Sequence, residues 1–287
     1  MLMFDPSYFI LDLVYLIRAP ITRSQKYEIF WIYLTLTLKK MLIRLKFIKG
    51  QNKIKILDFI IDYADYKSFY DLFCEIFLHN VYFFKSNKKT PLIVDCGSNI
   101  GLTVIYFKYL YPQAKILCFE PDEEALGLLK NNIRQNSLKN IKIFPIALAS
   151  RKGKAKFYIA KGIGASAVSG FFVYKYVKNI IEKTVKTDTL SKFIQEEVDF
   201  LKMDVEGAET QIIEELNSSG KIRNINQMVV EFHLSYFYKK PDFSRFLKVL
   251  EDNKMVHHFH AIAVPLFQLT KVQNLMIFAR KKTEQAI

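Results

Sequence analysis

The sequence predicts an α/β protein with a mainly parallel sheet, preceded by a mainly helical segment over residues 1–90. Two observations lead to this fold class. From Pro91 onward, short apolar runs alternate with amphipathic stretches, as βα units do in a parallel sheet. Before Pro91 the chain is rich in aromatic residues, Lys and Arg and contains one glycine, Gly50, which favours helices. We therefore expect a basic, helical accessory segment over residues 1–90 and an α/β domain over residues 91–282.

Periodicity places the individual elements of the α/β domain. A proline followed by three acids opens one helix at Pro121, which suits the positive end of a helix dipole. Two strands at the C-terminal end should form an antiparallel pair at the sheet edge. The expected strands are Leu92–Cys96, Lys115–Glu120, Ile141–Ile146, Val198–Met203, Gln227–Phe232, Met255–Val264 and Gln273–Lys281. The expected helices are Leu102–Tyr111, Pro121–Asn136, Glu206–Asn217 and Pro241–Asn253.

One stretch interrupts this repeat. Gly153–Lys186 combines a strand-like run, a loop bearing Gly and Ser, and an aromatic, basic run. It is too long for an ordinary connection between neighbouring elements. We expect it to be a functional insertion near the active site.

Composition and charge limit the partners that the protein could have. The 287 residues are 51% hydrophobic, enough for a substantial core, and carry a net charge of +14. That charge implies an anionic partner: nucleic acid, an anionic membrane surface or a phosphorylated substrate. The three cysteines, Cys74, Cys96 and Cys118, do not suggest a disulfide framework, because two of them lie in apolar strand-like runs. A reducing, cytoplasmic setting is the simpler expectation.

The first 55 residues hold half of the excess charge, with ten Lys and Arg against three acids. Two apolar runs lie here, Tyr8–Ile17 and Ile29–Leu38. Each is too short to span a bilayer, which takes roughly 20 residues, and no cleavage site follows the first. Because Lys39, Lys40, Arg44, Lys46 and Lys49 follow closely, residues 1–55 are candidates for peripheral contact with an anionic membrane. The alternative is that these helices only complete a soluble core.

A glycine-bearing loop follows the first predicted strand. Gly97 and Gly101 allow the backbone to turn sharply and approach a ligand. A dinucleotide loop would carry glycine where Asn99 stands, which disfavours a nicotinamide cofactor. Glu120 follows the second strand, where an acid can accept hydrogen bonds from both ribose hydroxyls, although Asp95 or Glu120 alone could be a turn or solvated residue. The candidate cofactor residues are Asp95, Gly97, Ser98, Asn99, Gly101, Glu120 and Pro121.

Three segments resemble the FkbM family of methyltransferases: VDCGSNIGLT at 94–103, FEPDEEAL at 119–126 and VDFLKMDVEGAE at 198–209. MVVEFH at 228–233 and the closing VQNLMIFAR are weaker support. The resemblance implies a class I methyltransferase with a Rossmann-like sheet in the order 3-2-1-4-5-7-6, its last strand antiparallel, and S-adenosylmethionine as cofactor. It also implies O-methylation, in many members of sugars or secondary metabolites. Residues 1–90 lie outside the resemblance.

In that strand order, the carboxyl ends of the first, fourth and fifth strands form one ledge above the cofactor. Lys202 and Asp204 lie on the fourth strand or just after it, and Glu231 and His233 on the fifth. A buried Lys202 must be paired, and we expect Glu231 or Asp204 as its partner. A purely structural ion-pair network is the alternative for all four residues.

Methyl transfer to a hydroxyl requires an acceptor held in line and a base for its proton. Histidine titrates near neutrality, so His233 is the expected base and Asp204 the group that orients it or the acceptor. Lys202 and Glu206 complete the candidate catalytic set, although Glu206 could instead be an acid at a helix start. Asp204, Glu206 and His233 could together bind a metal, but no spacing in the sequence requires one.

The alternative functions belong to different classes of protein. An RNA methyltransferase would fit the charge, but base-modifying enzymes of this fold commonly carry two prolines and an aromatic after the fourth strand, where this chain has DVEG at 204–207. Nucleic acid is therefore less favoured than a small-molecule or glycan acceptor. A membrane-associated binding module without catalysis is disfavoured by the intact cofactor loop.

Overall fold

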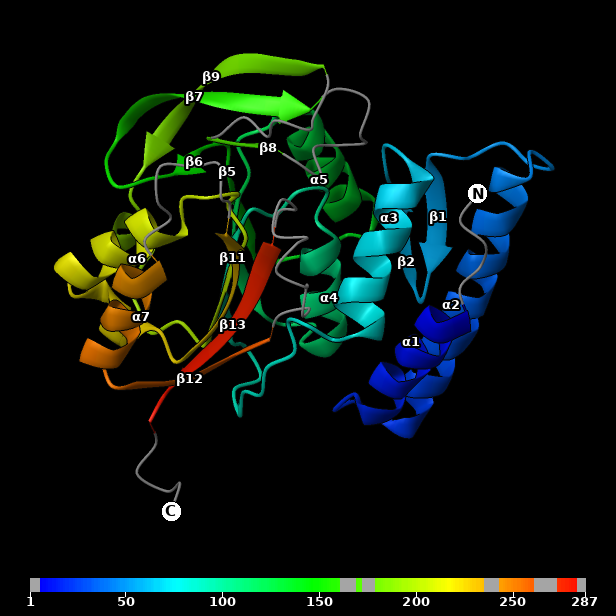
Figure 1. Ribbon diagram of the computed structural model, residues 1–287, viewed down its shortest axis with the longest axis horizontal. Coiled ribbons are helices and arrows are strands. Elements are labelled where there is room, and N and C mark those ends of the chain that lie inside the picture. The colour runs from blue at the N-terminus through cyan, green and yellow to red at the C-terminus, as the bar shows by residue number, and fades with distance from the viewer. Residues whose placement is uncertain (1–5, 161–168, 172–178, 235–242, 261–272, 283–287) are drawn as a thin grey trace, which may run out of the picture.

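The computed structural model describes residues 6–160, 169–171, 179–234, 243–260 and 273–282. A seven-stranded sheet forms the centre of the α/β part (Figure 1). From edge to edge its order is β5-β4-β3-β10-β11-β13-β12, which in chain order within the sheet is 3-2-1-4-5-7-6. Only β13 is antiparallel to its neighbours, β11 and β12. The strands are β3 (Leu92–Cys96), β4 (Lys115–Phe119), β5 (Ile141–Phe144), β10 (Phe200–Met203), β11 (Gln227–Leu234), β12 (Met255–His260) and β13 (Gln273–Lys281).

Helices cover both faces of this sheet because its central strands are apolar on both sides. Along β3, Ile93 belongs to the core beneath α4 and α5, whereas Leu92 and Val94 belong to the core beneath α6 and α7. In Figure 1, helices α4 and α5 lie on the side of the N-terminal segment, and helices α6 and α7 lie on the opposite side. The four helices are α4 (Leu102–Leu110), α5 (Glu123–Gln135), α6 (Glu209–Ser218) and α7 (Phe243–Asp252).

Most predicted elements are present with small shifts at their ends, and one shift changes the interpretation of a site residue. Helix α6 begins at Glu209, three residues after its predicted start. Glu206 has φ of 55° and Gly207 φ of 105°, so neither can continue a right-handed helix. Glu206 is therefore a loop residue, and the interpretation of it as a helix-start acid is wrong. Residues 241–242 and 261–264, predicted to be helix and strand, lie outside the described residues.

Together with β6, the predicted insertion forms a second, four-stranded sheet in the order β6-β9-β7-β8. Its long antiparallel pair joins β7 and β9, and it lies above the carboxyl ends of the main sheet (Figure 1). Its loops, residues 161–168 and 172–178, are outside the described residues. The strands are β6 (Ala147–Leu148), β7 (Gly153–Ala160), β8 (Ser169–Gly170) and β9 (Ile180–Asp188).

The N-terminal segment is mainly helical, as predicted, but it also contains a hairpin that was not predicted. The turn of this hairpin has Leu57 at φ of 50°, a conformation that usually selects Gly or Asn, so the sequence carries no turn signal here. Its second strand is held against α5, where the Asn132 and Asn136 side chains accept from the backbone N–H groups of Asp62 and Ile60. The elements are α1 (Pro6–Arg18), α2 (Arg23–Arg44), β1 (Lys53–Ile56), β2 (Phe59–Asp62), α3 (Tyr66–Phe73) and a π-helical turn (Cys74–Leu78).

This segment shares one core with the sheet instead of forming a core of its own. Phe77, fully buried, packs edge-on against Tyr106 of α4 at 5.2 Å between ring centroids. The Tyr106 hydroxyl donates to the side-chain oxygen of Asn80 at 2.9 Å. Phe84 stacks on Phe200 of β10 at 4.4 Å. Residues 6–90 therefore cover the α4 face of the sheet.

We expect Phe77→Ala to lower the free energy of unfolding by about 3–5 kcal/mol, because it leaves a cavity where the segment meets α4. Denaturant unfolding followed by circular dichroism measures this. Phe47→Ala is the matched control, since Phe47 is 74% exposed and its loss should change stability by less than about 0.5 kcal/mol. Equal effects of the two substitutions would contradict a shared core.

Candidate active site

Gly97 brings the loop after β3 into contact with the loop after β10. Its φ is +82°, and a Cβ at this position would lie 1.9 Å from the backbone oxygen of Asp204. No side chain can be accommodated there, which is the close approach that the glycine pattern predicted. The Asp204 N–H also donates to the carbonyl of Cys96 at 3.0 Å. Asp204 is thereby placed beside the cofactor loop.

Glu120 holds the cofactor loop with both of its oxygens. Oε2 accepts from the Asn99 N–H and Oε1 from the Asp122 N–H, each at 2.8 Å. Each carboxylate oxygen has a second lone pair, so the group can still accept from a bound ribose. Burial raises the pKa of Glu120 to about 7, against the two backbone hydrogen bonds that lower it.

The predicted cofactor residues fall into two groups. Gly97, Asn99, Glu120 and Pro121 line a pocket at the end of the sheet. The other three lie behind the loop and shape it. Asp95 is fully buried and accepts from Thr103 at 2.6 Å, Ser98 donates to the Asp95 carbonyl, and Gly101, at φ +85°, precedes α4 against Leu129.

An apolar wall of this pocket was not predicted residue by residue. It comes from β6, from the residue before β6 and from the insertion, and it suits a planar ring. Gly170 of β8 packs on the backbone of Glu206, where a Cβ would lie 2.7 Å from the Glu206 oxygen. The insertion therefore lies at the site, as predicted, although the sequence could not specify which of its side chains face inward. The apolar residues of the wall are Ile146, Ala147, Leu148, Phe157 and Phe171.

Lys202 is buried at the junction of β3 and β10. Its Nζ lies 3.5 Å from Asp95 Oδ1 and 3.6 Å from Asp204 Oδ2, and it donates to the Gly97 carbonyl. Burial alone would lower its pKa, but Asp204 and Asp95 raise it, so the ammonium stays charged.

The predicted pairing of Lys202 with Asp204 is confirmed, while Asp95 takes the place expected for Glu231. The strand register explains this, because Lys202 stands opposite Asp95 on one side and Val229 on the other. Glu231 lies two residues farther along β11 and accepts from Asn274 instead.

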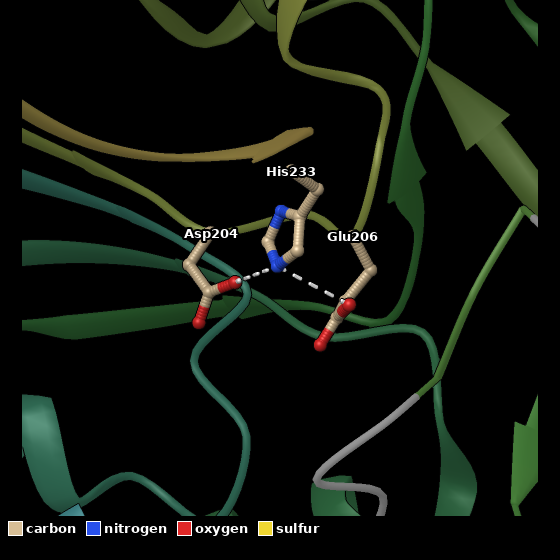
Figure 2. A group of neighbouring side chains, drawn as sticks. All are labelled: Asp204, Glu206 and His233. Atoms are coloured by element: carbon tan, nitrogen blue, oxygen red, sulfur yellow. Dashed lines mark ion pairs between the residues drawn. The ribbon is translucent and has the colours of Figure 1, made fainter. Parts of the chain in front are cut away.

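His233 lies on β11 and points between two acids of the loop after β10 (Figure 2). Its Nε2 is 3.3 Å from Glu206 Oε2 and 3.8 Å from Asp204 Oδ1. Its Nδ1 is 2.7 Å from Oε1 of Glu209, the buried first residue of α6. Sequence reasoning assigned no role to Glu209, although the acid stands in the DVEGAE run. Asp204 and Glu206 also line the cofactor pocket, so the acids around His233 and the cofactor residues share one cavity.

The charges around His233 correct one expectation. Burial would lower its pKa, but Glu206 and Glu209 raise it well above its ordinary value. The shift favours the protonated ring, whereas titration near neutrality was expected. Asp204, Glu206 and His233 each place a ligand atom within 4.8 Å of the others, so the group has the composition of a cation site. The protonated ring and the Lys202 ammonium already supply positive charge there.

Two residues of the N-terminal segment reach this network, and nothing in their sequence context indicated it. Tyr82 donates to Glu75 at 3.1 Å, and the Lys202 ammonium lies 5.6 Å from the centre of the Tyr82 ring. Burial, together with Glu231 and Asp204, raises the pKa of Glu75 to about 8. The segment therefore contributes to the electrostatics of the site as well as to the core.

The sheet order, the acid after β4 and the glycine-bearing loop after β3 are those of the class I methyltransferase fold, whose members use S-adenosylmethionine. The profile of the methyltransferase FkbM domain matches residues 95–256, more than half of the chain. The protein belongs to the FkbM methyltransferase family.

Relatives are similar over part of their length. Methyltransferase sdnD of Sordaria araneosa is 30% identical over 172 residues, which cover 50% of this chain and 66% of the relative. The 2-O-methyltransferase NoeI of Sinorhizobium fredii is 30% identical over 141 residues, covering 44% and 57%. The chain thus spans less than two thirds of either relative. A solved FkbM methyltransferase from Methylobacillus flagellatus superposes with a TM-score of 0.45 at 13% identity, over 75% of this chain and 55% of that one.

We expect Glu120→Ala to weaken S-adenosylmethionine binding by about 1–3 kcal/mol, the scale of lost charge-assisted hydrogen bonds. Calorimetric titration measures it, with Glu124→Ala, an exposed acid four residues on, as the control. Since the pKa of Glu120 is raised to about 7, wild-type affinity should fall as the pH drops below that value and the carboxylate is protonated. Wild-type affinity in Glu120→Ala would refute the assignment.

Proposed function

We propose that the protein transfers the methyl group of S-adenosylmethionine to a hydroxyl group, with His233 and Asp204 as the acceptor-activating pair. The observation that carries this proposal is the position of His233 Nε2 beside Asp204 and Glu206, two acids that line the pocket together with the cofactor loop. A hydroxyl group held there would contact a base for its proton and the cofactor at the same time.

The cofactor supplies a methyl group on a sulfonium, and the chain supplies orientation and proton transfer. Glu209 holds the ring of His233 through Nδ1, which leaves Nε2 directed at the acceptor position. Nε2 takes the proton of the hydroxyl once the ring has lost its own proton. Asp204, fixed by Lys202 and by the loop contact with Gly97, orients the acceptor. Lys202 positions Asp204 and Asp95 and does not itself activate the acceptor. Glu206 lies beside Nε2 of the His233 ring.

We propose a hydroxyl of a sugar, a glycan or glycolipid, or a secondary metabolite as the acceptor. Support comes from the polar, carboxylate-rich side of the pocket, which suits a hydroxyl-bearing ligand, and from NoeI, a relative named as a 2-O-methyltransferase. The insertion, which contacts Glu206, is the candidate for acceptor selection. Methyl transfer from labelled cofactor to panels of glycans, glycolipids and hydroxylated metabolites tests this class.

His233→Ala should lower single-turnover methyl transfer about 10²–10⁴-fold while cofactor affinity stays near wild type, because base catalysis contributes about that much. Asp204→Asn should impair both steps, since Asp204 also lines the cofactor pocket. Rapid-quench measurement of methyl transfer, with calorimetric titration of the cofactor, separates the two effects.

His257→Ala, a histidine on the edge strand β12, is the control for this substitution. The same assay with EDTA tests whether a metal ion at Asp204, Glu206 and His233 takes part. We expect unchanged turnover, because the His233 ring and the Lys202 ammonium already supply positive charge there. Near-normal turnover in His233→Ala would indicate that positioning of the acceptor alone accounts for the rate, and that the role of His233 is structural.

Turnover should rise with pH above neutrality, because the raised pKa of His233 keeps Nε2 protonated at lower pH. Glu209→Gln removes a carboxylate that raises this pKa, so the rise should move to lower pH and the maximum rate should fall. The measurement is the pH profile of single-turnover transfer. Glu214→Gln, on the same helix but paired with Arg245, should leave the profile in place. An unchanged profile in Glu209→Gln would rule out His233 as the titrating base.

A further inference from the structure

The outer face of α2 is apolar along the helix. Its exposed apolar residues are three, four or seven positions apart, so they form one stripe. Each is exposed over about half of its surface or more. The stripe consists of Tyr27, Trp31, Leu38, Met41 and Leu45.

The soluble core does not use this stripe. Helix α2 packs inward through Ile29, Tyr33 and Leu36, which are fully or almost fully buried and lie on the opposite side of the helix. Figure 1 places α1 and α2 at the edge of the molecule farthest from the sheet. A helix that only completed a core would carry polar residues on its outer face. Core packing therefore accounts for one face of α2 and leaves the other unexplained.

Positive charge lies at both ends of the stripe. After α2, the exposed Arg44, Lys46 and Lys49 alternate with Phe47 and Ile48, which are also exposed. None of these three cations makes an ion pair with any residue that the structure describes. At the other end, exposed Arg18 and Arg23 lie beside exposed Ile17. From Arg18 to Lys55 the only acid among ten basic residues is Glu28.

We propose that this surface, the outer stripe of α2 with its basic ends, docks on the headgroups of an anionic phospholipid membrane. The stripe extends for about 27 Å at the rise of an α-helix, long enough to lie along a membrane surface. Among the described residues, no helix is both long and apolar enough to cross a bilayer. The basic ends are complementary to acidic headgroups, while Tyr27 and Trp31 have the amphipathic rings that favour the interface.

Trp31 provides a direct test, because it is the only tryptophan in the chain and lies on the stripe. The full-length protein is mixed with vesicles of phosphatidylcholine, with or without phosphatidylglycerol. With the anionic vesicles we expect Trp31 fluorescence to shift to the blue and to be quenched by brominated acyl chains. Both changes should disappear at high salt. Neutral vesicles should change the spectrum much less.

The triple variant Arg44→Glu, Lys46→Glu and Lys49→Glu keeps Trp31 and the stripe. It should lower partitioning to anionic vesicles by at least on the order of 100-fold, since each basic residue contributes roughly a factor of five. Leu38→Ser with Leu45→Ser should abolish the blue shift while leaving the charge unchanged. Cofactor affinity and thermal unfolding of each variant in buffer should match wild type, because the substituted side chains are exposed.

The matched control reverses three exposed lysines of the catalytic domain instead: Lys130→Glu, Lys139→Glu and Lys142→Glu. It makes the same change in net charge and should retain binding. Three results would overturn the proposal: equal shifts with neutral and anionic vesicles, equal loss in the control triple variant, or a blue shift that grows with protein concentration without vesicles. The last would identify the stripe as an interface between two copies of the chain.

Discussion

The arrangement of the site depends on one buried ammonium. Lys202 joins β3 and β10 through Asp95, Asp204 and the Gly97 carbonyl, so it ties the cofactor loop to the loop that carries the acceptor-side acids. A buried charge is tolerated only when it is paired and hydrogen-bonded. Here Asp95 is a residue of β3, whereas Asp204 and the Gly97 carbonyl belong to the two loops that must be positioned. The same contact requires glycine at position 97, because the Asp204 backbone fills the space that a Cβ would occupy.

The polar network extends from this lysine across the carboxyl ends of three strands and into the N-terminal segment. Asp204 links Lys202 to the surroundings of His233, and Glu209 fixes the ring from the other side. Glu75 brings a further carboxyl group from the π-helical turn. Burial, with Glu231 and Asp204 adding to it, raises the pKa of Glu75, whereas Glu206 and Glu209 raise the pKa of His233 against the effect of its burial. The pKa of the proposed base is therefore set by carboxylates from the loop after β10, from α6 and from β11.

The N-terminal segment has two faces with different chemistry. Its inner face is aromatic and merges with the core over α4, where Phe77 and Phe84 pack against the catalytic domain. Its outer face, on α2, is apolar without a partner among the described residues, and its ends are basic. A rigidly packed helix can present such a surface without reorganising, as the proposed docking on a membrane surface requires.

Sequence alone determined the features that depend on local chemistry. Alternating apolar and amphipathic runs identified the α/β domain, and the residues VDCGSNIGLT, FEPDEEAL and VDFLKMDVEGAE carried the resemblance that family membership confirms. The placement of Gly97 and Glu120 at the ends of consecutive strands predicted the pocket because glycine requirements and strand ends can be recognised from short segments. The strand order in the structure is the one that the resemblance implied.

Tertiary structure decided what depends on register and long-range packing. Register placed Asp95 opposite Lys202 where Glu231 was expected, and left-handed backbone at Glu206 delayed the start of α6. Glu209 and Glu75 reached the site from elements whose orientation no periodicity specifies. The raised pKa of His233 likewise depends on carboxylates brought together only by folding, since charge interactions fall off within several ångströms and are unrelated to distance along the chain.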